Sequence, residues 1–449
     1  MNETKLVTVI SHYGLKGNVI LISRYMAGYL GLVNKEKVTV YVGQYNKDLE
    51  LRISDSLKNE NSIRLSAGLT RRMFLRSGSK YGIRCDGSVI HIGPVVGIMA
   101  EVFNQTGKPF GGQSYFISQV LMSGRRLGEI CFAFSPYSIN WNKNIIYGYK
   151  YGKNGWRKAV CPLPDVVYPR EKAYSYSKLN IRKKLAKKGV KFINPPLIGK
   201  WKTHQIIIKN PRLIPYIPET KLVKNSQQIN NMINKHRAVY LKPVAGSQGK
   251  NIIKIRKQGA SNYHYQYQMN NQLHKGSASS LVNLRSSLRR MMGRRKYIIQ
   301  KQINLIRSKG NILDVRILVQ KDSTGSWGIT GMACRVGRHG SITSNISTGG
   351  SGKKIEGILK RNFASEDQRI EIIESIKFVA LEAARTLEDS IGKAGEMGID
   401  IGIDKQGKVW FIEANLRPGR QVFTLIGKKQ IRRQSVQSPV LYARYLAGF

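Results

Sequence analysis

Acidic residues are scarce in this chain. Its 449 residues contain 26 Asp and Glu but 75 Lys and Arg, which gives a formal net charge of +49. Between Thr220 and Leu313 there is no acidic residue, although 19 Lys and Arg occur there. Two explanations are open. The positive field attracts polyanions and speeds their encounter with the protein, or the charge only reflects a highly basic proteome or serves solubility. No RNA-recognition, zinc-finger or helix-turn-helix signature is present, so sequence-specific nucleic-acid binding is not expected.

Cysteines and long apolar runs are also few. The four cysteines stand far apart without a Cys-x-x-Cys pair, which argues against a zinc site and a disulfide framework. The longest strongly apolar stretch, residues 89–100, contains His91 and Pro94 and is too short to span a bilayer. The first residues lack the features of a signal peptide. We therefore expect a protein of a reducing, cytoplasmic compartment with no membrane span.

The composition is that of a folded α/β protein. Its hydrophobic content is 41%, it has 44 glycines, and its length suits two or three domains. Short β-like runs bounded by Gly, Asn or Asp fill residues 1–85, and we interpret them as a small β-rich domain. Residues 86–197 combine strand and helix patterns and form an α/β domain. Residues 198–449 form the last domain and contain the motifs described below.

Two helices are predicted in this last domain. Residues 281–292 carry Leu and Met at helical spacing, with arginines on the outward face. A longer helix begins after Ser365, a favourable N-cap, and ends before Gly392, which suits the position after a helix. Apolar residues line one side of this longer helix, so it is expected to pack on the core without chemistry of its own.

The most informative motif is a β-hairpin near the C-terminal end. Turn residues at 404–407 separate two apolar strands. If the loop contains only two residues, Asp400 lies opposite Phe411, with Glu413 as its diagonal neighbour. Asp400, Glu413 and Asn415 then project from one face, because side chains alternate along a strand.

Two carboxylates and an amide oxygen that converge are hard oxygen ligands. Mg²⁺ takes such ligands together with nucleotide phosphates. The alternative is a surface hairpin with solvated acids. A solvated hairpin has no need of acids at this spacing among apolar neighbours, so the pattern favours a metal site.

A second motif follows a predicted strand that ends at Lys242. The loop Gly246-Ser247-Gln-Gly249 begins four residues after Lys242. Glycines allow backbone N–H groups to approach phosphate oxygens closely, and the lysine adds positive charge. The motif is not a Walker A loop, because the lysine precedes the glycines. A plain β-turn is the alternative interpretation.

The order of these parts resembles the ATP-grasp superfamily, and within it the spore-coat-associated YheC/YheD family. The similarity covers residues 195–449 well and is weaker in the first half, where it rests mainly on residues 92–98. The matching segments are residues 200–204 (Lys-Trp-x-Thr-His), 218–220, 297–300, 314–321, 327–331 and 345–350.

The resemblance implies an ATP-grasp fold built of α+β subdomains, preceded by the β-rich domain and an α/β pre-grasp domain. ATP would lie between two subdomains, with a basic lid of residues about 220–303 closing over it. The implied nucleotide-binding residues are Lys200, Lys242, Gly246, Ser247, Gly249, Gln300, Lys301 and Ile303. Arg316 and Arg335 would neutralise the transferred phosphoryl group. Asp400, Glu413 and Asn415 would hold one or two Mg²⁺.

Two positions depart from the family pattern. Lys200, Lys202 and His204 all compete for the role of the first lysine. The segment after the predicted strand 297–301 offers only the amides of Gln302 and Asn304, where many superfamily members have a carboxylate for the ribose.

The activity implied is an ATP- and Mg²⁺-dependent carboxylate–amine ligase that acts through an acylphosphate. Its partners would be a carboxylate substrate and an amine co-substrate, with an acidic peptide or polymer as acceptor. Two alternatives remain open. One is a spore-associated structural or polyanion-binding protein with a vestigial nucleotide site, and the other is phosphoryl transfer to a hydroxyl.

Overall fold

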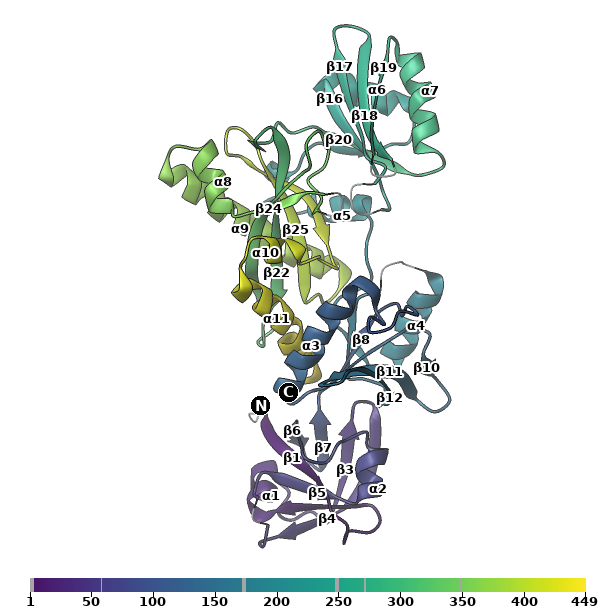
Figure 1. Cartoon of the computed structure of the whole chain (residues 1–449), viewed down its shortest axis with the longest axis vertical. Coiled ribbons are helices and arrows are strands. Elements are labelled where there is room, and N and C mark those ends of the chain that lie inside the picture. Colours follow the sequence, from purple (N-terminus) through teal and green to yellow (C-terminus); the bar gives the residue numbers. More distant parts are fainter. Residues whose placement is uncertain (1–3, 58, 172–174, 247–249, 270–271, 347–348) are drawn as a thin grey trace. The chain divides into compact units, whose positions relative to one another are not determined.

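A computed structural model describes residues 4–449 except 58, 172–174, 247–249, 270–271 and 347–348 (Figure 1). The chain forms two compact units. The first comprises Met1–Asn194, Lys321–Ser326 and Val436–Phe449, and the second comprises Pro195–Gln320 and Trp327–Ser435. Within the described residues, no helix combines the length and apolar character needed to cross a bilayer.

The first unit begins with a closed barrel of strand order β1-β5-β2-β4-β3-β7-β6. Its strands are β1 (Lys5–Ser11), β2 (Val19–Ser23), β3 (Lys37–Val42), β4 (Tyr45–Ser54), β5 (Ser62–Leu65), β6 (Ser79–Asp86) and β7 (Val89–Gly93), with helices α1 (Arg24–Leu30) and α2 (Ala67–Arg72). Alternate residues such as Val38 and Val40 are buried inside it. The barrel extends past residue 85, the boundary expected from the sequence, because β7 pairs with β3 and β6.

A sheet with a parallel centre follows, in the order β10-β11-β9-β8-β13-β14, with β12 paired to β11. Its strands are β8 (Val95–Met99), β9 (Ile130–Phe134), β10 (Ile139–Asn140), β11 (Ile145–Gly152), β12 (Gly155–Pro162), β13 (Val166–Pro169) and β14 (Lys191–Phe192). Its helices are η1 (Gly111–Gln113), α3 (Ser114–Arg126) and α4 (Tyr176–Lys187). Apolar residues of α3 share a core with Val440 and Tyr442 from the second half of α11 (Lys429–Ala447).

The second unit contains an antiparallel sheet of order β15-β20-β16-β17-β18-β19. Its strands are β15 (Thr220–Leu222), β16 (Ala238–Pro243), β17 (Ile253–Gln258), β18 (Asn262–Met269), β19 (Gln272–Ala278) and β20 (Tyr297–Lys301). Helices α6 (Ser226–His236) and α7 (Leu281–Met292) pack their apolar residues on one face of it. Arg285, Arg289 and Arg290 of α7 are exposed, as the sequence predicts.

The other sheet of this unit has the order β24-β23-β22-β25-β26, with β21 paired to β22. Its strands are β21 (Arg307–Ser308), β22 (Asn311–Lys321), β23 (Trp327–Val336), β24 (Ser351–Lys353), β25 (Glu396–Ile403) and β26 (Val409–Asn415). The helical elements around it are α5 (Lys200–Ile207), η2 (Ile214–Tyr216), α8 (Ile355–Asn362), α9 (Glu366–Ile391) and α10 (Gln421–Leu425). Helix α9 has the predicted caps, because the Ser365 side chain accepts from the Gln368 amide and Gly392 follows the last turn. Its apolar side packs on β23, β25 and β26, which places the hairpin against the core.

Candidate functional site

Strands β25 and β26 form the predicted hairpin, but in a different register. Asp400 lies directly opposite Glu413, and Phe411 pairs with Ile401. The predicted two-residue loop is therefore wrong. The Asp404 backbone N–H donates a hydrogen bond to the Lys408 carbonyl oxygen, so the loop between the strands contains the three residues 405–407. The register also shifts by a β-bulge or irregularity between Asp400 and Ile401.

The register places three oxygen-bearing side chains on one face of the hairpin. Asp400 and Glu413 are direct cross-strand neighbours, and Asn415 is two residues further along the same strand. The Asp400 side chain is 6% exposed, whereas that of Glu413 is 30% exposed. The two carboxylates therefore meet different surroundings.

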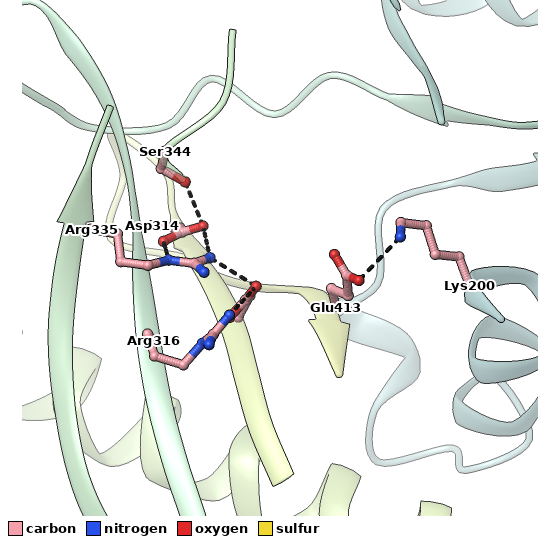
Figure 2. A network of polar contacts seen from close by, with 7 residues as sticks. Lys200, Asp314, Arg316, Arg335, Ser344 and Glu413 are labelled. Atoms are coloured by element: carbon pink, nitrogen blue, oxygen red, sulfur yellow. Dashed lines mark hydrogen bonds and ion pairs between the residues drawn. The ribbon is translucent and has the colours of Figure 1, made fainter. Parts of the chain in front are cut away.

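Asp400 is held by two arginines, Arg316 and Arg335; Figure 2 labels both arginines. Arg316 in β22 donates through Nε to Oδ1 at 2.5 Å and through Nη2 to Oδ2 at 3.0 Å. Arg335 in β23 contacts Oδ2 through Nη2 at 2.8 Å. Burial alone would raise the pKa of the Asp400 carboxyl, but the two guanidinium groups outweigh it and hold that pKa below its usual range.

A second buried carboxylate completes this network. Arg335 donates to Asp314 through Nε at 2.8 Å and Nη2 at 2.5 Å, and Ser344 Oγ donates to Asp314 Oδ2 at 2.6 Å. The two arginines and two aspartates balance in charge, and their hydrogen bonds offset the cost of burial. Both predicted catalytic arginines thus have fixed orientations. Sequence reasoning gave no role to Asp314 or Ser344, although Asp314 and Arg316 share a face of one strand.

Lys200, the first residue of α5, reaches the exposed side of this cluster. Its Nζ donates to Glu413 Oε1 at 3.1 Å and to the carbonyl oxygen of Gly246 at 2.8 Å. Lys202 is exposed, and His204 stacks on Trp201 with ring centroids 5.4 Å apart. Of these three competing residues, Lys200 is the one that the structure brings to Glu413.

Lys242 lies near the end of β16, as predicted, and its Nζ donates to Gln300 Oε1 in β20 at 2.6 Å. Gln300 in turn donates to Thr220 Oγ1 at 2.9 Å. Burial lowers the pKa of Lys242 to about 8, and the positive charge of Lys200 lowers it as well, against the opposing effect of Glu413 and other carboxylates. Lys242 therefore lies within electrostatic reach of the hairpin.

Two further predicted nucleotide-binding residues, Lys301 and Ile303, lie around the end of β20. Lys301 and Ile303 are partly buried there. The neighbouring Gln302 has a buried Oε1 that lacks a hydrogen-bond donor among the described residues. Such an orphaned acceptor suits a ligand that carries a hydroxyl or amino group. Ser247 and Gly249 of the glycine loop lie outside the described residues.

The oxygen donors of the hairpin fit Mg²⁺ shared with a phosphate-bearing ligand. Asp400 accepts three hydrogen bonds from arginines, and a carboxylate can accept about four. Glu413 and Asn415 are partly exposed. No group of three or more His, Cys, Asp or Glu in the described part of the chain could hold a metal ion. Asp400, Glu413 and Asn415 could still hold Mg²⁺, which binds one or two carboxylates and completes its shell with water and phosphate.

Comparison with known proteins now decides the family. The sequence profile of the YheC/D-like ATP-grasp family matches residues 189–446. The chain belongs to the YheC/D-like ATP-grasp family. Endospore coat-associated protein YheD of Bacillus subtilis is 30% identical over 398 residues, which cover 86% of this chain and 86% of YheD. Endospore coat-associated protein YheC of the same organism is 23% identical over 320 residues, covering 70% of this chain and 86% of YheC.

Solved structures similar to this YheC/D-like chain include ligases. The D-alanine-D-alanine ligase from Coxiella burnetii is 9% identical with a TM-score of 0.45, covering 78% of this chain and 96% of the ligase. The ATP-grasp ligase PsnB, solved with its minimal precursor, Mg and ADP, is 13% identical with a TM-score of 0.43, covering 77% of this chain and 98% of PsnB.

Proposed function

We propose that this chain is an ATP- and Mg²⁺-dependent ligase that joins a carboxylate to an amine. The observation that carries the proposal is the convergence of charged groups from separate elements. Lys200, Arg316 and Arg335 surround the carboxylates of Asp400 and Glu413, and Lys242 lies within electrostatic reach of both. A cluster of buried and partly buried charged groups of this kind is typical of a functional site.

The cations suit the binding of a triphosphate. Lys242 and Lys200 would contact its phosphates from β16 and α5. Arg316 and Arg335, oriented by their aspartates, would face the charge that develops on the transferred phosphoryl group. The backbone and amides from Gln300 to Ile303 would bind the base and ribose, and the orphaned Oε1 of Gln302 supports that assignment.

Asp400, Glu413 and Asn415 would hold Mg²⁺ at the hairpin. The metal, when bound, would neutralise phosphate charge and keep the reacting groups in line. The carboxylate oxygen of the substrate would attack the γ-phosphorus of ATP. This step would form an acylphosphate of the substrate and release ADP. The amine nitrogen would then attack the acyl carbon and release inorganic phosphate. No nucleophile from the protein is required.

The acceptor is proposed to be acidic. The segment from Thr220 to Leu313, which we propose to be the lid, contains no acidic residue. It carries exposed cations along and after α7, at Arg285, Arg289, Arg290, Arg294, Arg295 and Lys296. A clustered positive surface of this kind attracts acidic peptides or polymers to the neighbourhood of the site. The same surface is the observation that favours the second candidate function, polyanion binding without catalysis.

A substrate screen tests the proposal. Purified protein, ATP and Mg²⁺ are incubated with amino acids, short peptides and acidic polymers. ADP release is measured for each candidate, and the products are then identified by mass spectrometry. We expect ADP and inorganic phosphate to appear in equal amounts with an amide product. A phosphorylated acceptor would instead identify a phosphotransferase. Absence of ATP binding together with tight binding of acidic polymers would favour the polyanion-binding alternative.

A further inference from the structure

One ammonium group joins the two sheets of the second unit. Lys200 Nζ donates both to the carbonyl oxygen of Gly246, in the loop after β16, and to Glu413 Oε1 in β26. The Lys200 side chain is 15% exposed, so its charge is largely shielded from water. An ion pair in such surroundings is screened less than one at the surface. The Glu413 carboxylate, which we propose as a metal ligand, is thus already paired with the Lys200 ammonium.

The other cations of the cluster are committed elsewhere. Lys242 donates to Gln300, and Arg316 and Arg335 are held by Asp400 and Asp314. Within the described residues, Glu413 forms its ion pair with Lys200. Removal of the Lys200 charge therefore leaves the Glu413 carboxylate without its neutralising cation.

An ammonium and a divalent metal ion compete for the same carboxylate. Like charges a few ångströms apart in a partly buried site repel strongly, so a metal at Glu413 disfavours Lys200 in its present position. The phosphates of ATP offer Lys200 new acceptors. Nucleotide and metal therefore favour the same rearrangement, in which Lys200 leaves both Glu413 and the Gly246 carbonyl.

We propose that Lys200 is a placeholder cation. Without nucleotide it occupies the carboxylate that the metal needs and donates to the Gly246 carbonyl oxygen; with nucleotide it moves to the phosphates and leaves both groups. This inference rests on the proposed function, because it takes Glu413 as a metal ligand. It implies that metal binds weakly without nucleotide and that each ligand strengthens the binding of the other by the same factor.

Manganese binding tests this role without any turnover. Mn²⁺ alone is titrated into the nucleotide-free full-length protein and its free fraction is measured by electron paramagnetic resonance. Lys200→Met should bind Mn²⁺ at least about tenfold more tightly than wild type, because the competing charge is gone. Lys200→Gln, which keeps a hydrogen-bond donor without the charge, should behave in the same way. Lys200→Arg, which keeps the charge, and Lys202→Met, on the same helix but exposed, should match wild type.

The coupling between ligands provides the second measurement. ATP should strengthen Mn²⁺ binding less in Lys200→Met than in wild type. In wild type ATP draws the Lys200 ammonium away from Glu413, and in the variant that ammonium is already absent. If wild type binds ATP with Mn²⁺ while both neutral Lys200 variants keep the wild-type nucleotide-free Mn²⁺ affinity, the placeholder role is wrong and the ligase proposal stands. If wild type binds no Mn²⁺ even with ATP, the metal site of the proposed function fails with it.

Discussion

Glu413 is the residue on which the proposed metal chemistry depends most directly. Its side chain is 30% exposed and has one ammonium partner, whereas Asp400 is clamped by two arginines. Replacement of Glu413 by Ala removes one hard oxygen ligand from a partly solvated position, so we expect the fold to persist and Mg²⁺-dependent ATP turnover to be lost.

Steady-state ADP release checks this expectation, with far-UV circular dichroism as the control for folding. A rate within about tenfold of wild type, equivalent to only ~1.4 kcal/mol of barrier, would remove Glu413 from the metal site.

Arg316 should affect the rate more than the affinity. Its guanidinium is oriented by Asp400 and would meet charge that develops during phosphoryl transfer. Arg316→Ala should therefore lower kcat much more than it raises the KM for ATP. Steady-state kinetics over a range of ATP concentrations measures both constants. An unchanged kcat with a higher KM would assign Arg316 to ground-state binding of ATP.

The lowered pKa of Lys242 predicts that nucleotide binding depends on pH. Its pKa is lowered to about 8, first by burial and also by Lys200, while Glu413, Asp400 and Asp314 oppose the shift. The charged form is present below that pH and is lost above it, so ATP affinity should fall as the pH rises from about 7 to 9. Isothermal titration calorimetry across this range measures the fall, and Lys242→Gln should bind ATP weakly with a flatter profile. A wild-type affinity that is constant over the range would contradict this role.

The β25–β26 turn is the element that sets the geometry of the site. The Asp404 carboxylate accepts from the backbone amides of Gln406 and Lys408 and from Trp410 Nε1. These bonds close a longer loop than the sequence predicts, and that loop contributes to the pairing of Asp400 with Glu413. Loss of the Asp404 carboxylate therefore disturbs the register as well as the turn.

Asp404→Ala should lower the free energy of unfolding by about 1–3 kcal/mol and also weaken the Mg²⁺ dependence of turnover. Denaturant titration and Mg²⁺ titration of the rate measure the two effects. Asp322→Ala is the matched control, because Asp322 accepts from the Thr324 and Ser326 amides at the β22–β23 turn, which supplies no site residue. If both variants reduce the Mg²⁺ response equally, the turn at Asp404 has no special role.

Sequence patterns predicted elements better than they predicted pairings. Local chemistry predicts the caps of α9, the strand that carries Lys242 near its end and the outward arginines of α7, and the structure contains them. The hairpin register was wrong because it depends on side-chain bonds from Asp404 and on a shift in the ladder. The Arg335–Asp314 and Lys200–Glu413 pairs join distant parts of the chain, so no local pattern signals them.

At the scale of the whole molecule, the charge of +49 is the dominant property. If the exposed cations of α7 and the residues after it recruit an acidic acceptor, the apparent acceptor affinity should fall steeply with salt while ATP affinity changes little. Exposed charges are screened over about 8 Å at physiological ionic strength. Acceptor kinetics between low and physiological salt measure this effect.

Replacement of Arg289, Arg290, Arg294 and Arg295 by Gln should produce the same loss at low salt. These four side chains are exposed, so the fold should tolerate the change. Acceptor kinetics that respond neither to salt nor to the fourfold substitution would leave the charge a role in solubility alone.

The first unit is discontinuous in sequence, and this has a consequence for how the protein is made. Val440 and Tyr442 of α11 belong to the same core as Ile117 and Val120 of α3, yet the entire second unit is encoded between them. During synthesis the ribosome therefore releases α3 long before its apolar partner exists. A fragment that ends at Asn194 would keep that face of α3 uncovered, and we expect it to require a chaperone or to aggregate. The core around α3 can be finished only after α11 has been made.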